Sequence, residues 1–126
     1  MYKWYEVKTA ISPEEWYDKK GCWSGCVFTD DELTGGKPNL FYTSADYVKA
    51  MISQAKPKDE GLLNWEKVDN NPLLKGRPEG LDDDFRDCYL FRNGKKLYMI
   101  VGSSKSGNGT TTLHRYDEKA GTWSND

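Results

Sequence analysis

Short runs of apolar and aromatic residues alternate with turn-forming residues along the whole chain. Five of these runs are long enough and rich enough in β-branched or aromatic side chains to form strands: 22–29, 39–43, 88–92, 97–102 and 110–116. Glycine, proline or asparagine separates each run from the next. Short strands divided by frequent turn signals are typical of antiparallel sheets. The pattern therefore predicts an all-β protein.

The clearest pair of strands flanks Asn93-Gly94. An Asn-Gly pair between two apolar runs is a strong signal for a β-hairpin, because its turn needs residues that tolerate positive φ. Two lysines, Lys95 and Lys96, precede the next apolar residue, Leu97. We therefore expect a hairpin here with a loop longer than two residues.

Segment 45–56 supports two interpretations. Its apolar residues recur every three or four positions, which fits an amphipathic helix with Ser44 as the cap and Pro57 beyond the end. Val48, Ala50 and Ile52 also alternate as they would in a strand. Periodicity alone slightly favours the helix.

A weak internal repeat spans the chain. A segment that begins at Gly21 and leads to an aromatic strand near Tyr42 is echoed by a segment that begins at Arg86 and leads to Tyr98. Trp65 and Trp123 close the two copies. A repeat of roughly 60 residues that forms one four-stranded unit is typical of β-propeller blades.

Composition excludes several classes of protein. The chain has 126 residues with 18 basic and 20 acidic side chains, a net charge of −2 and 13% aromatic residues. No apolar run approaches the ~18 residues that a membrane span needs, and no basic patch points to a nucleic acid. No signal peptide is visible at the N-terminus, so the cellular compartment stays unknown. We expect a folded domain with neither a membrane nor a nucleic-acid partner.

The reactive side chains suggest no metal and no cofactor. The three cysteines, Cys22, Cys26 and Cys88, lack the paired spacing of a zinc site, and an odd number argues against a closed disulfide framework. His114 is the single histidine, which disfavours triad chemistry. The acidic runs 30–32 and 82–84 do not follow a calcium-loop pattern, and the glycine-rich stretch 102–109 lacks a phosphate-loop signature. We expect solvated acidic turns and a loop between strands.

Five segments of the chain carry recognisable motifs in a fixed order. They are 13–25 (PEEWYDKKGCWSG), 40–44 (LFYTS), 65–74 (WEKVDNNPLL), 84–88 (DFRDC) and 97–103 (LYMIVGS). These motifs resemble those of glycoside hydrolase family 32, the family of invertases, inulinases and levanases. Segment 13–25 is similar to that family's turn leading into Gly-x-Trp-Ser-Gly-Ser, and 84–88 is similar to its Asp-Phe-Arg-Asp-Pro. The order and spacing agree over nearly the whole chain.

This resemblance implies antiparallel four-stranded β-propeller blades, about two of a five-bladed propeller. Residues 1–126 would form a single partial domain, with the first blade over about 1–65 and the second over about 66–126. It also resolves segment 45–56 in favour of a strand. The implied substrates are fructosides such as sucrose, inulin or levan.

The resemblance also assigns candidate site residues. Asp87 matches the aspartate that hydrogen-bonds the fructosyl ring and stabilises an oxocarbenium-like transition state, and Arg86 precedes it as a charge partner. Trp23 and Ser24 match residues that line the fructose subsite. Hydrogen bonds that strengthen as charge develops lower a barrier without forming a bond. Without the family match, Arg86 and Asp87 would be interpreted as a surface ion pair worth under about 1 kcal/mol.

The family's two catalytic carboxylates have no counterpart in this sequence. The nucleophile belongs to an Asn-Asp-Pro motif that would precede Met1, and the acid/base belongs to a Glu-Cys motif that would follow Asp126. Retaining glycoside hydrolysis needs both groups. Cys26 and Cys88 further depart from the motifs, where the family has serine and proline. Losing the proline restores a backbone donor at position 88.

Two functions from different classes follow. The chain is part of a fructoside-cleaving enzyme with Asp87 in a supporting role, inactive alone, or it is a vestigial carbohydrate-binding or structural module. Incomplete propellers leave sheet edges open to other chains. We therefore also expect a homo-oligomer that covers these edges.

Overall fold

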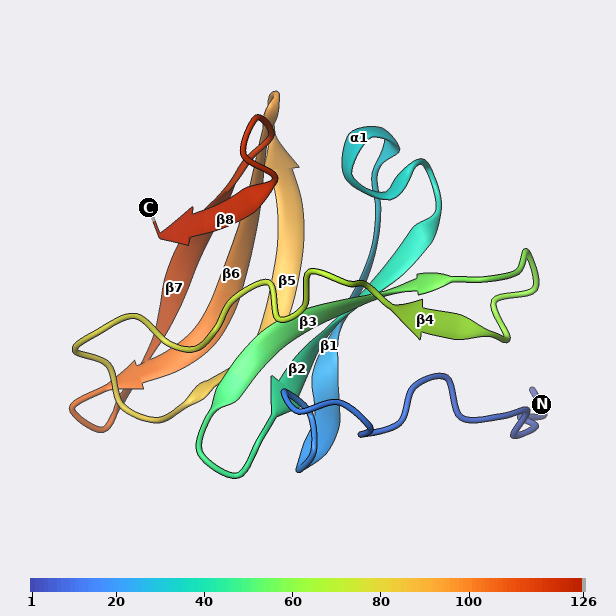
Figure 1. Cartoon of the computed structure of the whole chain (residues 1–126), viewed down its shortest axis with the longest axis horizontal. Coiled ribbons are helices and arrows are strands. Elements are labelled where there is room, and N and C mark those ends of the chain that lie inside the picture. The colour runs from blue at the N-terminus through green and yellow to red at the C-terminus, as the bar shows by residue number, and fades with distance from the viewer. Residues whose placement is uncertain (126) are drawn as a thin grey trace.

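The chain folds into two twisted antiparallel sheets in the computed structural model, which describes residues 1–125 (Figure 1). The first sheet has the order β1-β2-β3-β4 and the second has the order β5-β6-β7-β8. The strands are β1 (Gly21–Thr29), β2 (Pro38–Ala45), β3 (Ala50–Pro57), β4 (Trp65–Lys67), β5 (Phe85–Asn93), β6 (Lys96–Lys105), β7 (Asn108–Asp117) and β8 (Thr122–Asn125). The predicted all-β class and the two four-stranded units are confirmed.

The one helix among these residues, α1 (Asp31–Thr34), forms a single turn between β1 and β2. The Asp30 side chain caps it by accepting hydrogen bonds from the backbone N–H groups of Glu32 and Leu33. Helix α1 is too short to cross a membrane, and no other helix occurs in the described part of the chain.

Segment 45–56 is mostly strand, as the family resemblance implied. β2 ends at Ala45, and β3 begins at Ala50 and pairs with β2 from Ala45↔Ala50 to Leu40↔Ala55. Met51, Ile52, Ser53, Gln54 and Ala55 are all buried. The helical spacing misled because both faces of β3 are covered, so its burial does not alternate.

The hairpin at Asn93-Gly94 is tighter than the sequence predicts. Asn93 pairs with Lys96, so the loop contains only Gly94 and Lys95. Gly94 adopts a φ of 61°, which a glycine reaches without a steric penalty. The expectation of a longer loop was wrong because Lys95 is the second loop residue and Lys96 already belongs to β6.

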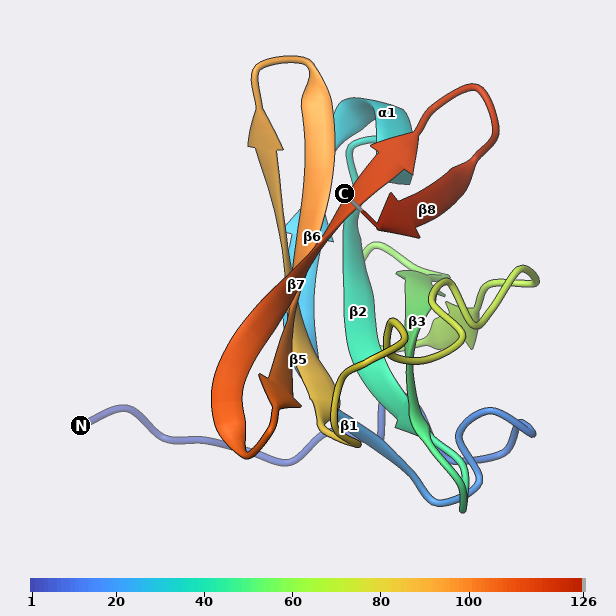
Figure 2. The same cartoon turned by 90° about the vertical axis from the view of Figure 1, so that its left-hand side faces the viewer.

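The hydrophobic core lies between the two sheets, where β5 packs against β1, β2 and β3 (Figure 2). Both sheets contribute to it, together with the connection between them. The buried members are Phe41, Ile52, Leu74, Phe85, Cys88, Leu90, Met99 and Val101. Leu74 reaches the core through a bridge to Ile52, which attaches the connecting segment 68–84 to β3.

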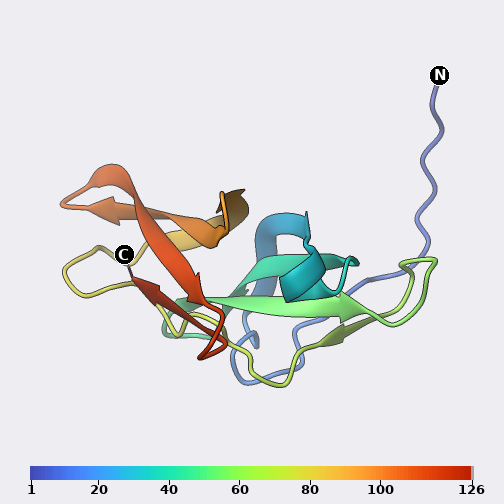
Figure 3. The same ribbon diagram turned by 90° about the horizontal axis from the view of Figure 1, so that it is seen from above.

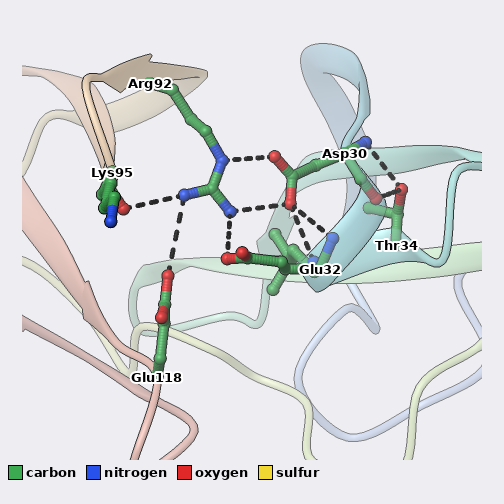
Figure 4. A network of polar contacts seen from close by, with 7 residues as sticks. Asp30, Glu32, Thr34, Arg92, Lys95 and Glu118 are labelled. Carbon is green, nitrogen blue, oxygen red and sulfur yellow. Dashed lines mark hydrogen bonds and ion pairs between the residues drawn. The ribbon is translucent and has the colours of Figure 1, made fainter.

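A cluster of ion pairs around Arg92 joins the sheets at one end (Figure 4). The Arg92 guanidinium, on β5, donates to both carboxylate oxygens of Asp30, which follows β1. It also donates to Glu32 at 3.0 Å and to the Lys95 carbonyl at 2.9 Å, and it lies 3.6 Å from Glu118. The acidic run 30–32 is therefore not simply solvated, because the Asp30 side chain is only 8% exposed.

The N-terminal residues 1–10 extend away from both sheets (Figure 3). They form no strand, and all ten are exposed. Tyr2 and Trp4 are each 95% exposed and Tyr5 is 79% exposed. This arm presents a row of large aromatic side chains to its surroundings.

Candidate functional site

Two β-bulges lie on β1 and β5, the neighbouring first strands of the two sheets. In β1, Trp23 pairs with Thr43 and Gly25 with Tyr42, so Ser24 is the inserted residue. In β5, Arg86 pairs with Gly102 and Tyr89 with Ile100, so two residues, Asp87 and Cys88, oppose one on β6. A bulge changes which way a side chain points and is common beside functional sites.

The bulge in β5 turns two charged residues toward solvent in succession. Phe85 and Cys88 are buried, whereas Arg86 and Asp87 between them are both exposed. A regular strand would bury one of two consecutive residues, because successive side chains point to opposite faces. Asp87 accommodates the change with a φ of 60°, a conformation that Asp tolerates better than most residues.

Thr43 connects the two bulges. Its hydroxyl donates to the Ser24 carbonyl at 2.9 Å and accepts from the backbone N–H of Asp87 at 3.0 Å. Thr43 itself is fully buried on β2. One hydroxyl therefore satisfies a backbone group of each bulge and sets Ser24 and Asp87 close to one another.

Asp84, Arg86 and Asp87 form a row of three exposed charged side chains, with Arg86 between the two carboxylates. Arg86 Nη1 lies 3.3 Å from Asp84 Oδ1, whereas Arg86 Nε lies 3.9 Å from Asp87 Oδ2. The Ser104 hydroxyl donates to the other Asp84 oxygen at 2.9 Å. The closer partner of Arg86 is therefore Asp84, which leaves the Asp87 carboxylate, 59% exposed, open to a ligand.

Trp23 lies beside Ser24 on β1 and is 40% exposed. Its ring covers Gly21, where an added Cβ would fall 2.5 Å from the indole Nε1. The Lys20 ammonium lies 5.7 Å from the ring centroid, within the range of a cation–π contact. These two neighbours hold the ring while one part of it stays accessible.

The structure brings Ser24 and Asp87 together through Thr43 and places Trp23 and Arg86 next to them along their strands. Beside this junction the chain exposes a carboxylate, a guanidinium, a hydroxyl and part of an indole ring. Aromatic surface combined with a few polar groups suits a polyhydroxylated ligand, since each hydroxyl both donates and accepts.

Sequence reasoning missed Thr43 and Asp84. Both lie in segments that match the family motifs, 40–44 and 84–88, but neither was named as a candidate site residue. Asp82 in the acidic run 82–84 accepts from the backbone N–H groups of Ser106 and Gly107, and Asp83 pairs with Arg77 at 2.7 Å. The partners of Asp82 and Asp84 come from the distant segment 104–107, so no local sequence signal marks these two carboxylates, whereas Asp83 is fully exposed, as expected for a solvated turn.

Residues 1–125 contain no cluster of three or more His, Cys, Asp or Glu side chains that could hold a metal ion. His114 is buried on β7, where its Nε2 lies 2.8 Å from the Thr112 hydroxyl. Burial lowers the pKa of His114 below its usual value. A buried neutral histidine of this kind supports the fold rather than an exposed site.

Comparison with known proteins places this geometry in a family. The model described as the glycosyl hydrolases family 32 N-terminal domain matches residues 1–125. A bifunctional fructosyltransferase of Allium cepa is 34% identical over 84% of this chain and 18% of its own length. An insoluble β-fructofuranosidase of Daucus carota is 32% identical over 91% of this chain and 20% of its own length.

Solved structures of the same family agree with this comparison. The crystal structure of fructan 1-exohydrolase IIa from Cichorium intybus is 32% identical, with a TM-score of 0.78 over 93% of this chain and 22% of that one. Sucrose-6-phosphate hydrolase from Lactobacillus gasseri is 25% identical, with a TM-score of 0.76 over 97% of this chain and 25% of that one. The chain spans about a fifth of the length of the curated relatives it matches. Its two sheets are β-propeller blades, and the chain belongs to glycoside hydrolase family 32.

Proposed function

We propose that this chain forms one wall of a fructoside-binding site, with Asp87 as the residue that stabilises the transition state. The observation that carries the proposal is the contrast within Asp87 itself. Its backbone is held by Thr43 at the junction of the two sheets, whereas its carboxylate is 59% exposed. A rigid backbone under an accessible carboxylate is what a preorganised ligand contact requires.

The four side chains have distinct roles in this proposal. Asp87 accepts hydrogen bonds from ring hydroxyls of the fructosyl unit, and these bonds strengthen as positive charge develops on the ring. Arg86 orients and balances the charge of Asp87. Trp23 packs its indole against the sugar, and Ser24 exchanges hydrogen bonds with the sugar hydroxyls.

Hydrolysis needs two further carboxylates, about 5–5.5 Å apart in a retaining enzyme. Residues 1–126 contain neither an Asn-Asp-Pro motif nor a Glu-Cys motif, the two places where the family resemblance puts them. We therefore expect these residues by themselves to bind fructosides without cleaving them. Sucrose, inulin and levan are the substrates that we propose for the complete active site.

A binding titration tests whether the chain binds fructosides at this site. The 15N-labelled chain is titrated with 1-kestose, the sugar bound in a solved structure of the Cichorium intybus relative, and with sucrose. We expect shifts of the backbone amides near Ser24 and Asp87, and we expect Asp87→Asn and Trp23→Ala to weaken binding several-fold. Shifts confined to other segments, or equal affinity of both variants and the parent chain, would rule the site out.

Matched controls separate the site from general surface effects. Asp69→Asn removes an exposed carboxylate from the connecting segment, and Tyr47→Ala removes an aromatic ring that is 79% exposed beyond the end of β2. Both should bind 1-kestose like the parent chain.

Catalysis is tested separately by incubating the purified chain with sucrose, inulin or levan and measuring released fructose. We expect none above background. Release that persists in a homogeneous preparation would show that a carboxylate pair is present after all.

A second candidate is a binding or structural module that self-associates. It is favoured by the N-terminal arm, whose Tyr2, Trp4 and Tyr5 side chains are almost fully exposed. Aromatic side chains in this number favour burial against another surface, and unpaired sheet edges add to the tendency. Light scattering at micromolar concentration should show a homo-oligomer that becomes smaller when residues 1–10 are removed. A monomer at every concentration would contradict this candidate.

A further inference from the structure

Two of the three cysteines meet where the sheets pack together. Cys26 lies on β1 of the first sheet and Cys88 on β5 of the second, and these two strands are packed against each other. Cys88 is a buried member of the core, and Cys26 is a partly buried residue packed against that core.

The contact between these cysteines is reciprocal. The Cys26 sulfur interacts with the Cys88 thiol and with the backbone N–H of Leu90, both on β5. The Cys88 sulfur in turn interacts with the Cys26 thiol and with the backbone N–H of Cys26. Both side chains therefore lie in one cluster at the junction of β1 and β5.

The electrostatics of the pair assign different roles to the two thiols. The interaction with Cys88 lowers the pKa of Cys26 below the ordinary value of a thiol, so Cys26 is the more readily ionised member of the pair. The same contact, together with burial, raises the pKa of Cys88. Because the thiolate is the nucleophile in disulfide chemistry, Cys26 is the thiol that attacks first.

The third cysteine is in a different environment. The Cys22 thiol donates to Asp18 Oδ2 at 3.6 Å, and Asp18 is fully buried. Burial and the Asp18 carboxylate raise the pKa of Cys22 to about 11. Cys22 therefore stays a protonated, poorly reactive thiol and serves as an internal reference.

We propose that Cys26 and Cys88 form a reversible disulfide that links the two sheets beside Asp87. The partly exposed Cys26 thiolate attacks a low-molecular-weight disulfide, RSSR, to give a mixed disulfide and one RS⁻. Cys88 then loses its proton and attacks the Cys26 sulfur, which expels the second RS⁻. The two thiols lose two protons and two electrons in total, and RSSR is reduced to two RSH.

The disulfide would hold the candidate site in place. Cys88 directly follows Asp87 in the bulge, and Cys26 lies two residues after Ser24. Because the cross-linked residues are far apart in the sequence, the disulfide constrains the unfolded chain strongly. Oxidation would therefore stabilise the chain and hold the two bulges in place.

The experiment compares the reduced chain with the chain treated with oxidised glutathione at pH 7.5. We expect alkylation in denaturant to modify three thiols before oxidation and one afterwards, with a cross-linked peptide containing Cys26 and Cys88 in the protease digest. The thermal midpoint should rise by on the order of 10 °C and return after treatment with dithiothreitol.

Three variants make the outcome decisive. Cys22→Ser should oxidise like the parent chain, whereas Cys26→Ser and Cys88→Ser should show no intramolecular link and no oxidation-dependent rise of the thermal midpoint. If either of the latter variants fails to fold, Cys22→Ser alone still tests the pair, because it contains only these two cysteines. Three alkylatable thiols after oxidation, a stable glutathione adduct at Cys26, a link to Cys22 or a link between chains would overturn the proposal.

Discussion

The backbone N–H of Asp87 donates to the hydroxyl of Thr43 at 3.0 Å, across the junction of the two sheets. The same hydroxyl donates to the Ser24 carbonyl at 2.9 Å. A buried threonine on the first sheet thus holds the backbone of the main candidate residue on the second sheet.

Replacing Thr43 with valine should destabilise the chain by about 1–3 kcal/mol, because the variant leaves two backbone groups without their partner at nearly unchanged volume. Hydrogen exchange of the Asp87 amide should become faster as well. Thr43→Ser keeps the hydroxyl and is the control. Urea denaturation of the three proteins measures the effect, and equal stability of the valine variant would mean that Thr43 does not support the bulge.

Replacing Arg92 with methionine should lower the free energy of unfolding by roughly 2 kcal/mol, a typical value for hydrogen bonds to charged groups. Arg92 contacts Asp30, Glu32 and Glu118 at once, and its side chain is only 26% exposed. Its loss leaves Asp30, 8% exposed, without its cationic partner.

Arg115→Met, an exposed change on β7, is the control for this cluster. It should alter stability by less than about 0.5 kcal/mol. If both arginine variants unfold at the same urea concentration as the parent chain, the cluster does not hold the sheets together.

Gly25→Ala should prevent stable folding. An added Cβ would lie 1.8 Å from the Phe41 carbonyl oxygen, which is backbone in the paired strand and cannot rotate away. Gly109→Ala is the matched control, because an added Cβ there meets nothing within 4 Å. Circular dichroism and thermal unfolding compare the two, and a normally folded Gly25→Ala chain would contradict the geometry of the β1 bulge.

Stability should fall as the pH drops below about 6.5, the ordinary pKa of histidine. Burial lowers the pKa of His114 in the folded state, so the unfolded chain binds the proton first and protonation favours unfolding. The His114→Gln variant should lose this part of the pH dependence, as measured by thermal unfolding between pH 5 and pH 8.

The protonation of Asp30 should produce a second loss of stability at lower pH. Its hydrogen bonds with Arg92 lower its pKa from 3.8 to about 2 in the folded state. The stabilisation from ionised Asp30 is therefore present above pH 4 and is lost as the pH falls toward 2. His114→Gln should leave this second decline in place, whereas Asp30→Asn should make it smaller, because Asp46, Asp59 and Asp82 also have lowered pKa values in the folded state. A parent chain whose stability is constant from pH 8 to pH 5 would contradict the assignment of His114.

Much of the fold could be predicted from local sequence. The strands at 22–29, 39–43, 88–92, 97–102 and 110–116 lie within β1, β2, β5, β6 and β7. Their apolar and aromatic runs, bounded by turn residues, were enough to identify them. Segment 45–56 needed the family resemblance, because burial on both faces removes the alternation that marks a strand.

The bulges could not be predicted, although they orient the candidate site. Whether Arg86 and Asp87 point to opposite faces or to the same face depends on one extra residue in the pairing of β5 with β6. That register is decided by the packing of both sheets, which the local pattern does not encode. The roles of Trp23, Ser24, Arg86 and Asp87 in binding a sugar stay predictions.

The sequence by itself determined the strand-forming segments, the repeat and the motifs of the family. Only the tertiary structure decided which distant residues meet: Asp87 with Thr43, Arg92 with Asp30, and Cys26 with Cys88. In the sequence, Cys26 and Cys88 only appear as cysteines at positions where two family motifs have serine and proline. The fold brings both to the same part of the core. The physical reason is that strand formation depends on neighbouring side chains, whereas contacts between sheets depend on how two completed surfaces pack.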